Sequence, residues 1–267
     1  MSFNCSVPMQ AGHRGNAQIL CLRKGLRMDE QLYAIPVNDA FNEDTECPVC
    51  SMYASLQKNA IEFTMGPSYM EDDVRMETNE VGFCAKHVEM MYGNQNRLGL
   101  GLMLHTHMQN LIKETEKAQK KGRSSGGGFF KKNTEGSAVS AYMRQVKNSC
   151  YICNRIENIF ERYIDTIFYL YEKDSAFKAK FDASKGFCVD HYQVLYDAAE
   201  SHMSGGALKD FTAKIDKLFL ENMKRVCDDV EWYTDKFDYR NKDADWKNSK
   251  DALIRAIKKL DSIELQL

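Results

Sequence analysis

The chain has 267 residues and a formal net charge of -2; 43% of its residues are hydrophobic and 28% are charged. These values are typical of a globular protein with one large domain or two small ones. They exclude a strong overall field that would recruit nucleic acid, and no stretch approaches the roughly 18 apolar residues of a membrane span. The start lacks the apolar core of a secretory signal, so we expect a cytoplasmic protein without a membrane partner.

The N-terminal third contains two segments with no helical periodicity. Residues 1–27 show no apolar pattern and are interpreted as an N-terminal extension, expected to be disordered. The stretch 32–37 is predicted to be extended, as a short edge strand or a leader, because Pro36 argues against a central strand. After Cys50 the apolar spacing predicts a helix, which Gly66 and Pro67 end.

The middle of the chain is predicted to contain an acidic loop and one long helix. The loop, residues 67–81, carries Glu71, Asp72, Asp73 and Glu77. From His87 to about residue 121 a single helix is expected, in which His105 belongs to the apolar face and packs in the core. That face is made of Leu98, Leu102, His105, Met108 and Ile112.

The remainder of the chain is predicted to be a linker followed by helices only. Residues 122–140 are rich in glycine and serine, which favours a mobile connection. Helices are expected after Cys153, from His191 to about residue 202, across the amphipathic stretch 208–233, and from Ser249 onward. No segment alternates as a strand would, so the predicted fold class is all-α.

Six of the nine cysteines belong to a motif that occurs twice. In each copy a Cys-x2-Cys pair is followed by Gly-Phe-Cys-x2-His, and the first and third cysteines are 37 and 38 residues apart. Clustered cysteines in a reducing compartment bind metal more often than they form disulfides. The first copy holds Cys47, Cys50, Cys84 and His87, and the second holds Cys150, Cys153, Cys188 and His191.

Each copy supplies three cysteines and one histidine, which is a ligand set of structural zinc sites. The sequence therefore predicts two zinc ions, with an iron–sulfur cluster as the alternative because sulfur-rich sites suit both. The similar separations favour a complete site within each copy. A swapped arrangement, joining each Cys-x2-Cys to the other copy's Cys-x2-His, stays open. A thioredoxin-like redox pair is disfavoured, because that motif belongs beside a βαβ pattern.

The chain also resembles a known protein family. The resemblance rests on residues 32–41, Cys47-Pro48-Val49-Cys50, residues 66–75, the Gly82-Phe83-Cys84-x2-His87 motif and residues 96–100. The family is a bacterial domain of unknown function, associated with anaerobic bacteria. The resemblance covers residue 28 to the C-terminus and implies a cytoplasmic bacterial protein, but it carries no reaction.

These observations predict two related helical halves from an internal duplication, each stapled by a Cys3His metal site. The predicted parts are the extension 1–27, a first repeat 28–121, the linker 122–140 and a second repeat 141–267 with C-terminal helices. The leading interpretation is a non-enzymatic zinc-binding module or scaffold with a protein or small-molecule partner. A metal- or redox-responsive sensor is second, and an enzyme using the acidic loop is third. The oligomeric state stays open.

Overall fold

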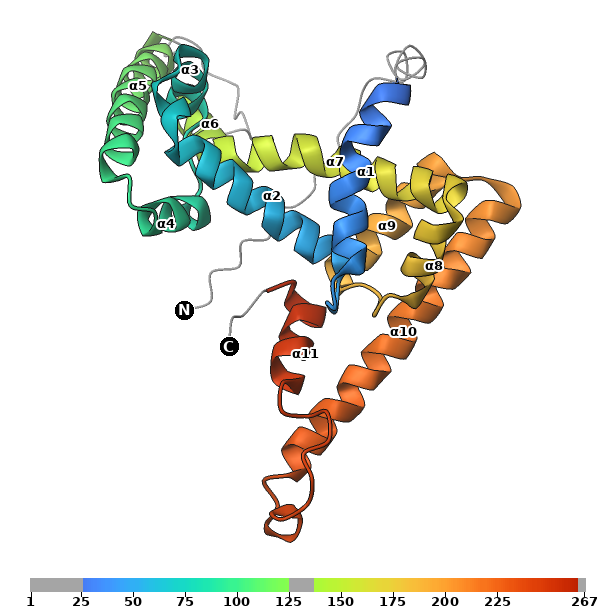
Figure 1. Cartoon of the computed structure of the whole chain (residues 1–267). Helices are drawn as coiled ribbons and strands as arrows, with labels where there is room; N and C mark the ends of the chain where they lie inside the picture. The colour runs from blue at the N-terminus through green and yellow to red at the C-terminus, as the bar shows by residue number, and fades with distance from the viewer. Residues whose placement is uncertain (1–25, 125–136, 264–267) are drawn as a thin grey trace, which may run out of the picture. The chain divides into compact units, whose positions relative to one another are not determined.

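The computed structural model describes residues 26–124 and 137–263, which form eleven α-helices and no strand (Figure 1). The predicted all-α class is therefore confirmed for the described residues. None of these helices is long and apolar enough to cross a membrane. The predicted extension 1–27, apart from its last two residues, and most of the predicted linker 122–140 lie outside the described residues.

The described residues form two compact units, and each unit contains residues from both halves of the sequence. Unit 1 comprises residues 56–124 and 137–158, and unit 2 comprises residues 26–55 and 159–263. Helices α2 (Pro48–Met65) and α7 (Tyr151–Lys173) each contribute residues to both units. The chain therefore passes from one unit to the other more than once. The helix predicted after Cys50 is α2, and it ends before Gly66 as expected.

Unit 1 is built around its longest helix, against which α3 and α6 pack. Besides parts of α2 and α7, its helices are α3 (Asp72–Val81), α4 (Ala85–Gly93), α5 (Arg97–Ser124) and α6 (Ala138–Lys147). The single helix predicted from His87 is thus two helices, because Asn96 caps the second. The Asn96 side chain accepts from the Gly99 N–H at 2.9 Å and donates to the Met65 carbonyl at 2.8 Å.

The prediction of which face of α5 is buried is wrong. Leu98, Met108 and Ile112 are 69%, 59% and 59% exposed, and His105 is exposed rather than packed in a core. This stripe faces away from the helices that pack on α5, so hydropathy alone selects the wrong side.

The packed side of α5 contains polar residues, so the spacing of apolar residues in the sequence does not identify it. Leu100 and Met103 are 4% and 0% exposed, and His107 and Asn110 continue the same side at helical spacing. The His107 Nδ1 and the Asn110 amide both lie near the Asn79 carbonyl of α3, at 2.9 and 3.3 Å. Hydrogen bonds to a helix end, and not only apolar contact, therefore hold α3 on α5.

The segment predicted as an acidic loop is mostly helical. A 3₁₀ turn at Pro67–Met70 leads into α3, whose first turn contains Asp72 and Asp73. Carboxylates stabilise the positive end of a helix, and Asp73 also accepts from the Val74 N–H at 2.8 Å. Together with the exposed Glu71 and Glu77, these residues face solvent. The positive end of α3 therefore accounts for Asp72 and Asp73.

Unit 2 encloses an aromatic core. Besides parts of α2 and α7, its helices are α1 (Leu26–Asn42), α8 (Ser175–Ala183), α9 (Val189–His202), α10 (Gly205–Asp235) and α11 (Ala252–Asp261). Phe181 lies at the centre, with ring centroids 5.5 Å from Phe41, 5.4 Å from Phe187 and 5.7 Å from Phe211. Phe177, Phe181, Phe187 and Phe211 are all 0% exposed. Burial of these rings supplies the main driving force for folding of this unit.

The prediction that residues 32–37 are extended is wrong, because these residues lie inside α1. Val37, Ala40 and Phe41 recur at helical spacing and are buried, at 0%, 4% and 7% exposed. Pro36 is tolerated, although it removes one backbone donor from the helix. Packing of this buried face, in which Phe41 contacts the aromatic rings of α8, outweighs the local preference of the proline.

A histidine–carboxylate pair joins α9 to α7 in unit 2. His202 Nε2 lies 2.8 Å from Asp165 Oδ1, and the imidazole stacks on Phe168 with centroids 4.5 Å apart. The hydrogen bond to Asp165 raises the pKa of His202 above its ordinary value. The protonated form of His202 is therefore the one that stabilises the fold.

This pair predicts a pH-dependent contribution to stability. Because the folded pKa is raised, the contribution is fully present below about pH 6.5 and is lost as the pH rises through the folded value. We expect Asp165→Asn to lower the melting temperature clearly at about pH 5.5 and hardly at about pH 9. Circular dichroism melts check this, with Asp197→Asn, at an exposed site on α9, as the control. An equal effect of Asp165→Asn at both pH values would contradict it.

Candidate metal centres

The structure gathers the eight predicted ligand residues into two groups that could each hold a metal ion. Within each group the ligand atoms all lie within 4.8 Å of one another. The unit 1 cluster is Cys84, His87, Cys150 and Cys153. The unit 2 cluster is Cys47, Cys50, Cys188 and His191.

Each cluster takes its Cys-x2-Cys from one copy of the motif and its Cys-x2-His from the other. The expectation that each copy would close its own site is therefore wrong, and the swapped arrangement is the one observed. The equal separations within the copies did not decide the pairing, because they follow equally from a swapped arrangement. The Cys-x2-Cys pairs begin α2 and α7, which is why each pair lies in the other unit from the rest of its copy.

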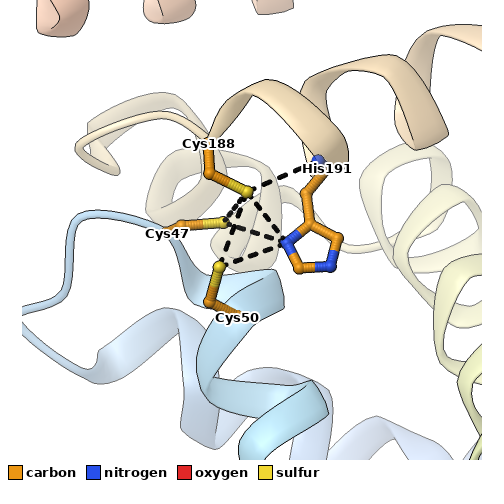
Figure 2. Close-up of side chains that lie close together, drawn as sticks. All are labelled: Cys47, Cys50, Cys188 and His191. Carbon is orange, nitrogen blue, oxygen red and sulfur yellow. Dashed lines mark hydrogen bonds between the residues drawn. The ribbon is translucent and has the colours of Figure 1, made fainter. Parts of the chain in front are cut away.

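In the unit 2 cluster the imidazole and three sulfurs point toward one common centre (Figure 2). The Cys188 sulfur lies 3.8 Å from that of Cys47 and 3.5 Å from that of Cys50. His191 Nδ1 lies 3.5, 3.2 and 3.1 Å from the sulfurs of Cys47, Cys50 and Cys188. The same ring nitrogen serves in unit 1, where His87 Nδ1 lies 3.3 to 3.4 Å from its three sulfurs.

These distances fit the edges of one small tetrahedron. With zinc–sulfur bonds of about 2.3 Å and a zinc–nitrogen bond of about 2.0 Å, the S···S edge is about 3.8 Å and the S···N edge about 3.5 Å. The observed separations reach these values or fall a few tenths short. The donor set and the geometry both fit a single four-coordinate ion in each cluster.

Every ligand lies at the start of a helix, where the backbone favours negative charge. Cys84 is the N-cap of α4 and Cys188 is the N-cap of α9, and the Cys188 sulfur accepts from the His191 N–H at 3.4 Å. The Cys-x2-Cys pairs occupy the starts of α2 and α7. Helix N-termini stabilise thiolate, which is the form that binds metal.

The glycine of each Gly-Phe-Cys motif has a backbone role. Gly82 and Gly186 have φ angles of +68° and +74°, which favour glycine. A Cβ on Gly82 would lie 2.4 Å from the His107 ring, and one on Gly186 would lie 2.8 Å from the Leu218 carbonyl. The glycines therefore allow the chain to turn tightly before each N-cap cysteine.

Hydrogen bonds within each cluster set which thiols lose their protons. Those from Cys47 and then Cys50 lower the pKa of Cys188, and the bond to Cys188 raises the pKa of Cys50. In unit 1 the bond from Cys153 lowers the pKa of Cys150 to about 3. These directions favour the thiolate form at Cys188 and at Cys150, which is the form that binds metal.

The two histidines differ in what supports their rings. His87 Nε2 lies 2.9 Å from the side-chain amide of Gln57, which is 8% exposed. The Gln57 atom at this distance is its amide nitrogen, which donates to an unprotonated Nε2. Metal on Nδ1 leaves the proton on Nε2, and a Gln57 amide turned over by 180° would then accept that proton through its oxygen and orient the ring. Phe160, at the same position of the other copy, lies against His191 instead, with ring centroids 5.7 Å apart. Burial opposes protonation of His191, but the Cys188 thiolate raises its pKa to about 10.

Different contacts join the two ligand-bearing loops in the two units. In unit 1 the Tyr151 N–H donates to the Gly82 carbonyl at 2.9 Å, and the Ser149 hydroxyl donates to the Val81 carbonyl at 2.7 Å. Pro48 occupies the position that matches Tyr151 in unit 2 and has no N–H to donate.

A lysine from the C-terminal helix α11 makes the connection in unit 2. Lys259 is 1% exposed, and its ammonium donates to the carbonyls of Glu46 and Lys185, at 2.6 and 2.5 Å. These residues stand just before Cys47 and shortly before Cys188. Burial lowers the pKa of Lys259, which the nearby Glu46 carboxylate opposes. Arg225 also pairs with Glu46 at 2.5 Å, so two cations lie beside the anionic cluster.

The two clusters differ in exposure. All four ligands of the unit 2 cluster are buried, and the Ser262 hydroxyl after α11 covers Cys188 at 3.1 Å from its sulfur. In the unit 1 cluster Cys84 and Cys153 are half-exposed. Small reagents therefore have a shorter path to the unit 1 sulfurs.

The supporting residues Lys259, Ser262 and Gln57 were not predicted. Lys259 stands in a basic, amphipathic helix, where a lysine normally faces solvent, so no local pattern marks it. Gln57 could have been suspected, because a polar residue interrupts the apolar spacing of α2 at the position where the other copy has Phe160.

A comparison with protein families finds a match over most of the chain. Residues 28–266 match the model of a family of unknown function (DUF6062). The chain belongs to this family. DUF6062 has no assigned activity, so membership transfers no reaction, and the match spans both clusters. The resemblance stated from the sequence is thereby confirmed as one to a domain of unknown function. Neither the curated proteins nor the solved structures contain a match to the chain.

The ligand pairing predicts which double variants lose one ion and which lose two. We expect Cys50→Ser with His191→Ala to keep one ion per chain, because both residues belong to the unit 2 cluster. We expect Cys50→Ser with His87→Ala to lose both ions, because each change disrupts a different cluster. Metal analysis after dialysis against a chelator reads out the count. Pairing within each copy would give the opposite result for the two variants.

The clamp made by Lys259 predicts a loss of stability on its removal. Lys259→Met removes the donor of two buried carbonyls, while Glu46 keeps its pair with Arg225, and we expect a loss of about 3 kcal/mol. Urea unfolding of the metal-loaded protein measures it. Lys250→Met, at an exposed lysine just before α11, is the matched control and should change little. Equal midpoints for Lys259→Met and wild type would show that the clamp is dispensable.

Proposed function

We propose that the chain is a non-enzymatic protein in which two zinc ions, one in each cluster, hold a helical binding module together. The observation that carries this proposal is that each set of four ligands draws on both copies of the motif. Structural zinc supplies folding free energy on the order of 10 kcal/mol in small modules. Four protein ligands also leave no coordination position for a water or a substrate, which argues against catalytic zinc.

The short separations between ligand atoms favour zinc over an iron–sulfur cluster. In a cluster of several irons the cysteines bind different metal atoms, so their sulfurs lie farther apart than the edge of one tetrahedron. Here all ligand atoms lie within 4.8 Å, and the measured S···S distances are 3.5 and 3.8 Å. Three thiolates and one neutral imidazole leave a charge of about -1 with Zn²⁺. Free thiols in this number also suit a reducing compartment, which supports a cytoplasmic location.

We further propose that the two copies arose by internal duplication. Both Cys-x2-Cys pairs begin long helices, both Cys-x2-His motifs begin with an N-cap cysteine, and both motif glycines have positive φ. Gln57 and Phe160 contact the histidine of their own copy from matching positions. These shared details go beyond what metal binding alone requires.

A sensor of oxidants or metal is the second candidate, and the half-exposed Cys84 and Cys153 favour it. Peroxide could oxidise two thiolates of the unit 1 cluster to a disulfide, and the peroxide would be reduced to water as the ion is released. The buried unit 2 cluster would keep its ion and continue to stabilise the fold. A sensor of this kind would use one centre for signalling and the other for stability.

The metal itself is tested by analysis of anaerobically purified protein. We expect two zinc ions per chain and a colourless solution, because Zn²⁺ has no visible absorption. A brown chromophore with stoichiometric iron and sulfide would contradict the zinc proposal and would identify an iron–sulfur protein.

The difference in exposure predicts two phases of metal release. With a chromogenic chelator and a mild peroxide, we expect one ion to leave at least about tenfold faster than the other, since thiolate reactivity follows access. The Cys50→Ser, His191→Ala variant, which keeps only the unit 1 cluster, should show the fast phase alone. Its counterpart His87→Ala should show the slow phase alone. Release of both ions at one rate would remove the support for a sensor.

A further inference from the structure

The C-terminal helix α11 contacts the chain just before both ligand pairs of the unit 2 cluster. The Lys259 ammonium donates to the carbonyls of Glu46 and Lys185, at 2.6 and 2.5 Å. Glu46 directly precedes Cys47, and Lys185 comes three residues before Cys188. The helix also packs on α9, whose N-cap is Cys188. One helix therefore lies across both ligand-bearing loops.

The residue that follows α11 contacts a ligand directly. The Ser262 hydroxyl lies 3.1 Å from the Cys188 sulfur and 2.7 Å from Asp190 Oδ2, so it can donate to either. Ser262 also has a left-handed φ of +57°, a conformation that is unfavourable for residues with a Cβ. Its hydrogen bonds offset that cost. The end of α11 is therefore fixed to the loop that carries Cys188.

The unit 2 ligands offer almost no surface to a reagent in solution. Cys47 and Cys188 are 0% exposed, Cys50 is 5% exposed and His191 is 8% exposed. Helices α2 and α9 begin at these ligands, so neither can move away without breaking a bond to a bound ion. No residue of α11 belongs to the cluster. This helix can therefore detach while all four ligands keep their places.

Polar contacts supply much of the attachment of α11. The helix has ten residues, and helices this short are marginal in water without packing. Its buried residues are Ala252, Lys258 and Lys259, whereas Leu253 and Leu260 are 43% and 55% exposed. Elements with few buried apolar contacts open at a lower free energy than a packed core. Opening of α11 is therefore easier than unfolding of the aromatic core of unit 2.

We propose that α11 is a strap that controls exchange of the unit 2 ion, which leaves or enters only when α11 detaches. The inference rests on the proposed zinc function, because the controlled group is that ion. It adds a conformational step to a site that otherwise only stabilises the fold. The unit 1 cluster, with Cys84 and Cys153 half-exposed, is an internal reference in the same chain.

The test follows release of zinc from the full-length, metal-loaded protein to an excess of a chromogenic chelator, without oxidant. We expect a fast phase from unit 1 and a slow phase from unit 2. Ala256→Gly, in the middle of α11, should speed the slow phase about fivefold and leave the fast phase unchanged. That factor corresponds to about 1 kcal/mol of lost helix propensity. A single phase in the wild-type chain would show that α11 gives no protection and would overturn the proposal.

Ala213→Gly is the matched control, because it makes the same substitution at an exposed site in α10 of the same unit. It weakens unit 2 without changing α11, and the slow phase should stay within about twofold of the wild-type rate. Equal acceleration by the two variants would show that the ion leaves by unfolding of the whole unit. An unchanged slow phase in Ala256→Gly would show that the ion leaves without α11. Either result would overturn the proposal.

Hydrogen exchange followed by mass spectrometry identifies the element that moves. In metal-loaded Ala256→Gly the amides of α11 should exchange about fivefold faster, and those of α9 should be unchanged. Exchange of α11 and α9 at one common rate in the wild-type chain would overturn the proposal, because the two helices would then open together.

Metal content of the same samples separates this inference from the proposed function. Two zinc ions per chain, with release that does not depend on α11, would reject the strap and leave the zinc module standing. A chain that binds no zinc would reject both, because the strap would have no ion to control.

Discussion

The structure depends on two clusters in which each set of four cysteine and histidine side chains comes from distant parts of the chain. The sulfurs of Cys47 and Cys188 approach to 3.8 Å across 141 residues of sequence, and His87 meets Cys150 across 63 residues. A cluster can form only when both helix starts and both N-cap loops have reached their places. The positive φ of Gly82 and Gly186, the caps of α4 and α9, and the hydrogen bonds between the loops all serve this convergence.

The two clusters show how one ligand pattern is supported in two ways. In unit 1 the ligand-bearing loops join each other directly, through the backbone of Tyr151 and the hydroxyl of Ser149. In unit 2 the proline after the first cysteine removes that backbone donor, and Lys259 supplies the missing donors from a helix near the C-terminus. The replacement also buries the cluster and places a cation near it. The local change at Pro48 is therefore coupled to the presence of α11.

The residues that gather in the two clusters and the helical class were predictable, because thiol and imidazole spacing and the absence of alternating strands are local patterns. The pairing was not, since spacing along the chain does not state which helix start meets which loop. The faces of α5 were misjudged because its packed side contains His107 and Asn110, whose value lies in hydrogen bonds to Asn79. The helix at 26–42 was missed because buried contacts of Phe41 outweigh Pro36. Lys259 could not be predicted either, because its role exists only after the fold brings Glu46 and Lys185 together.

The pairing of each Cys-x2-Cys with the other copy's Cys-x2-His has a consequence for synthesis on the ribosome. When the first copy of the motif has left the exit tunnel, it holds four potential ligands but neither of the observed sites. The unit 1 cluster becomes possible only after Cys153 emerges, and the unit 2 cluster only after His191. Until then Cys47 and Cys50 remain open to oxidation or to capture of the wrong ion, and closing such long loops slows folding. For this chain, the period of greatest chemical vulnerability is therefore the interval before its second half is made.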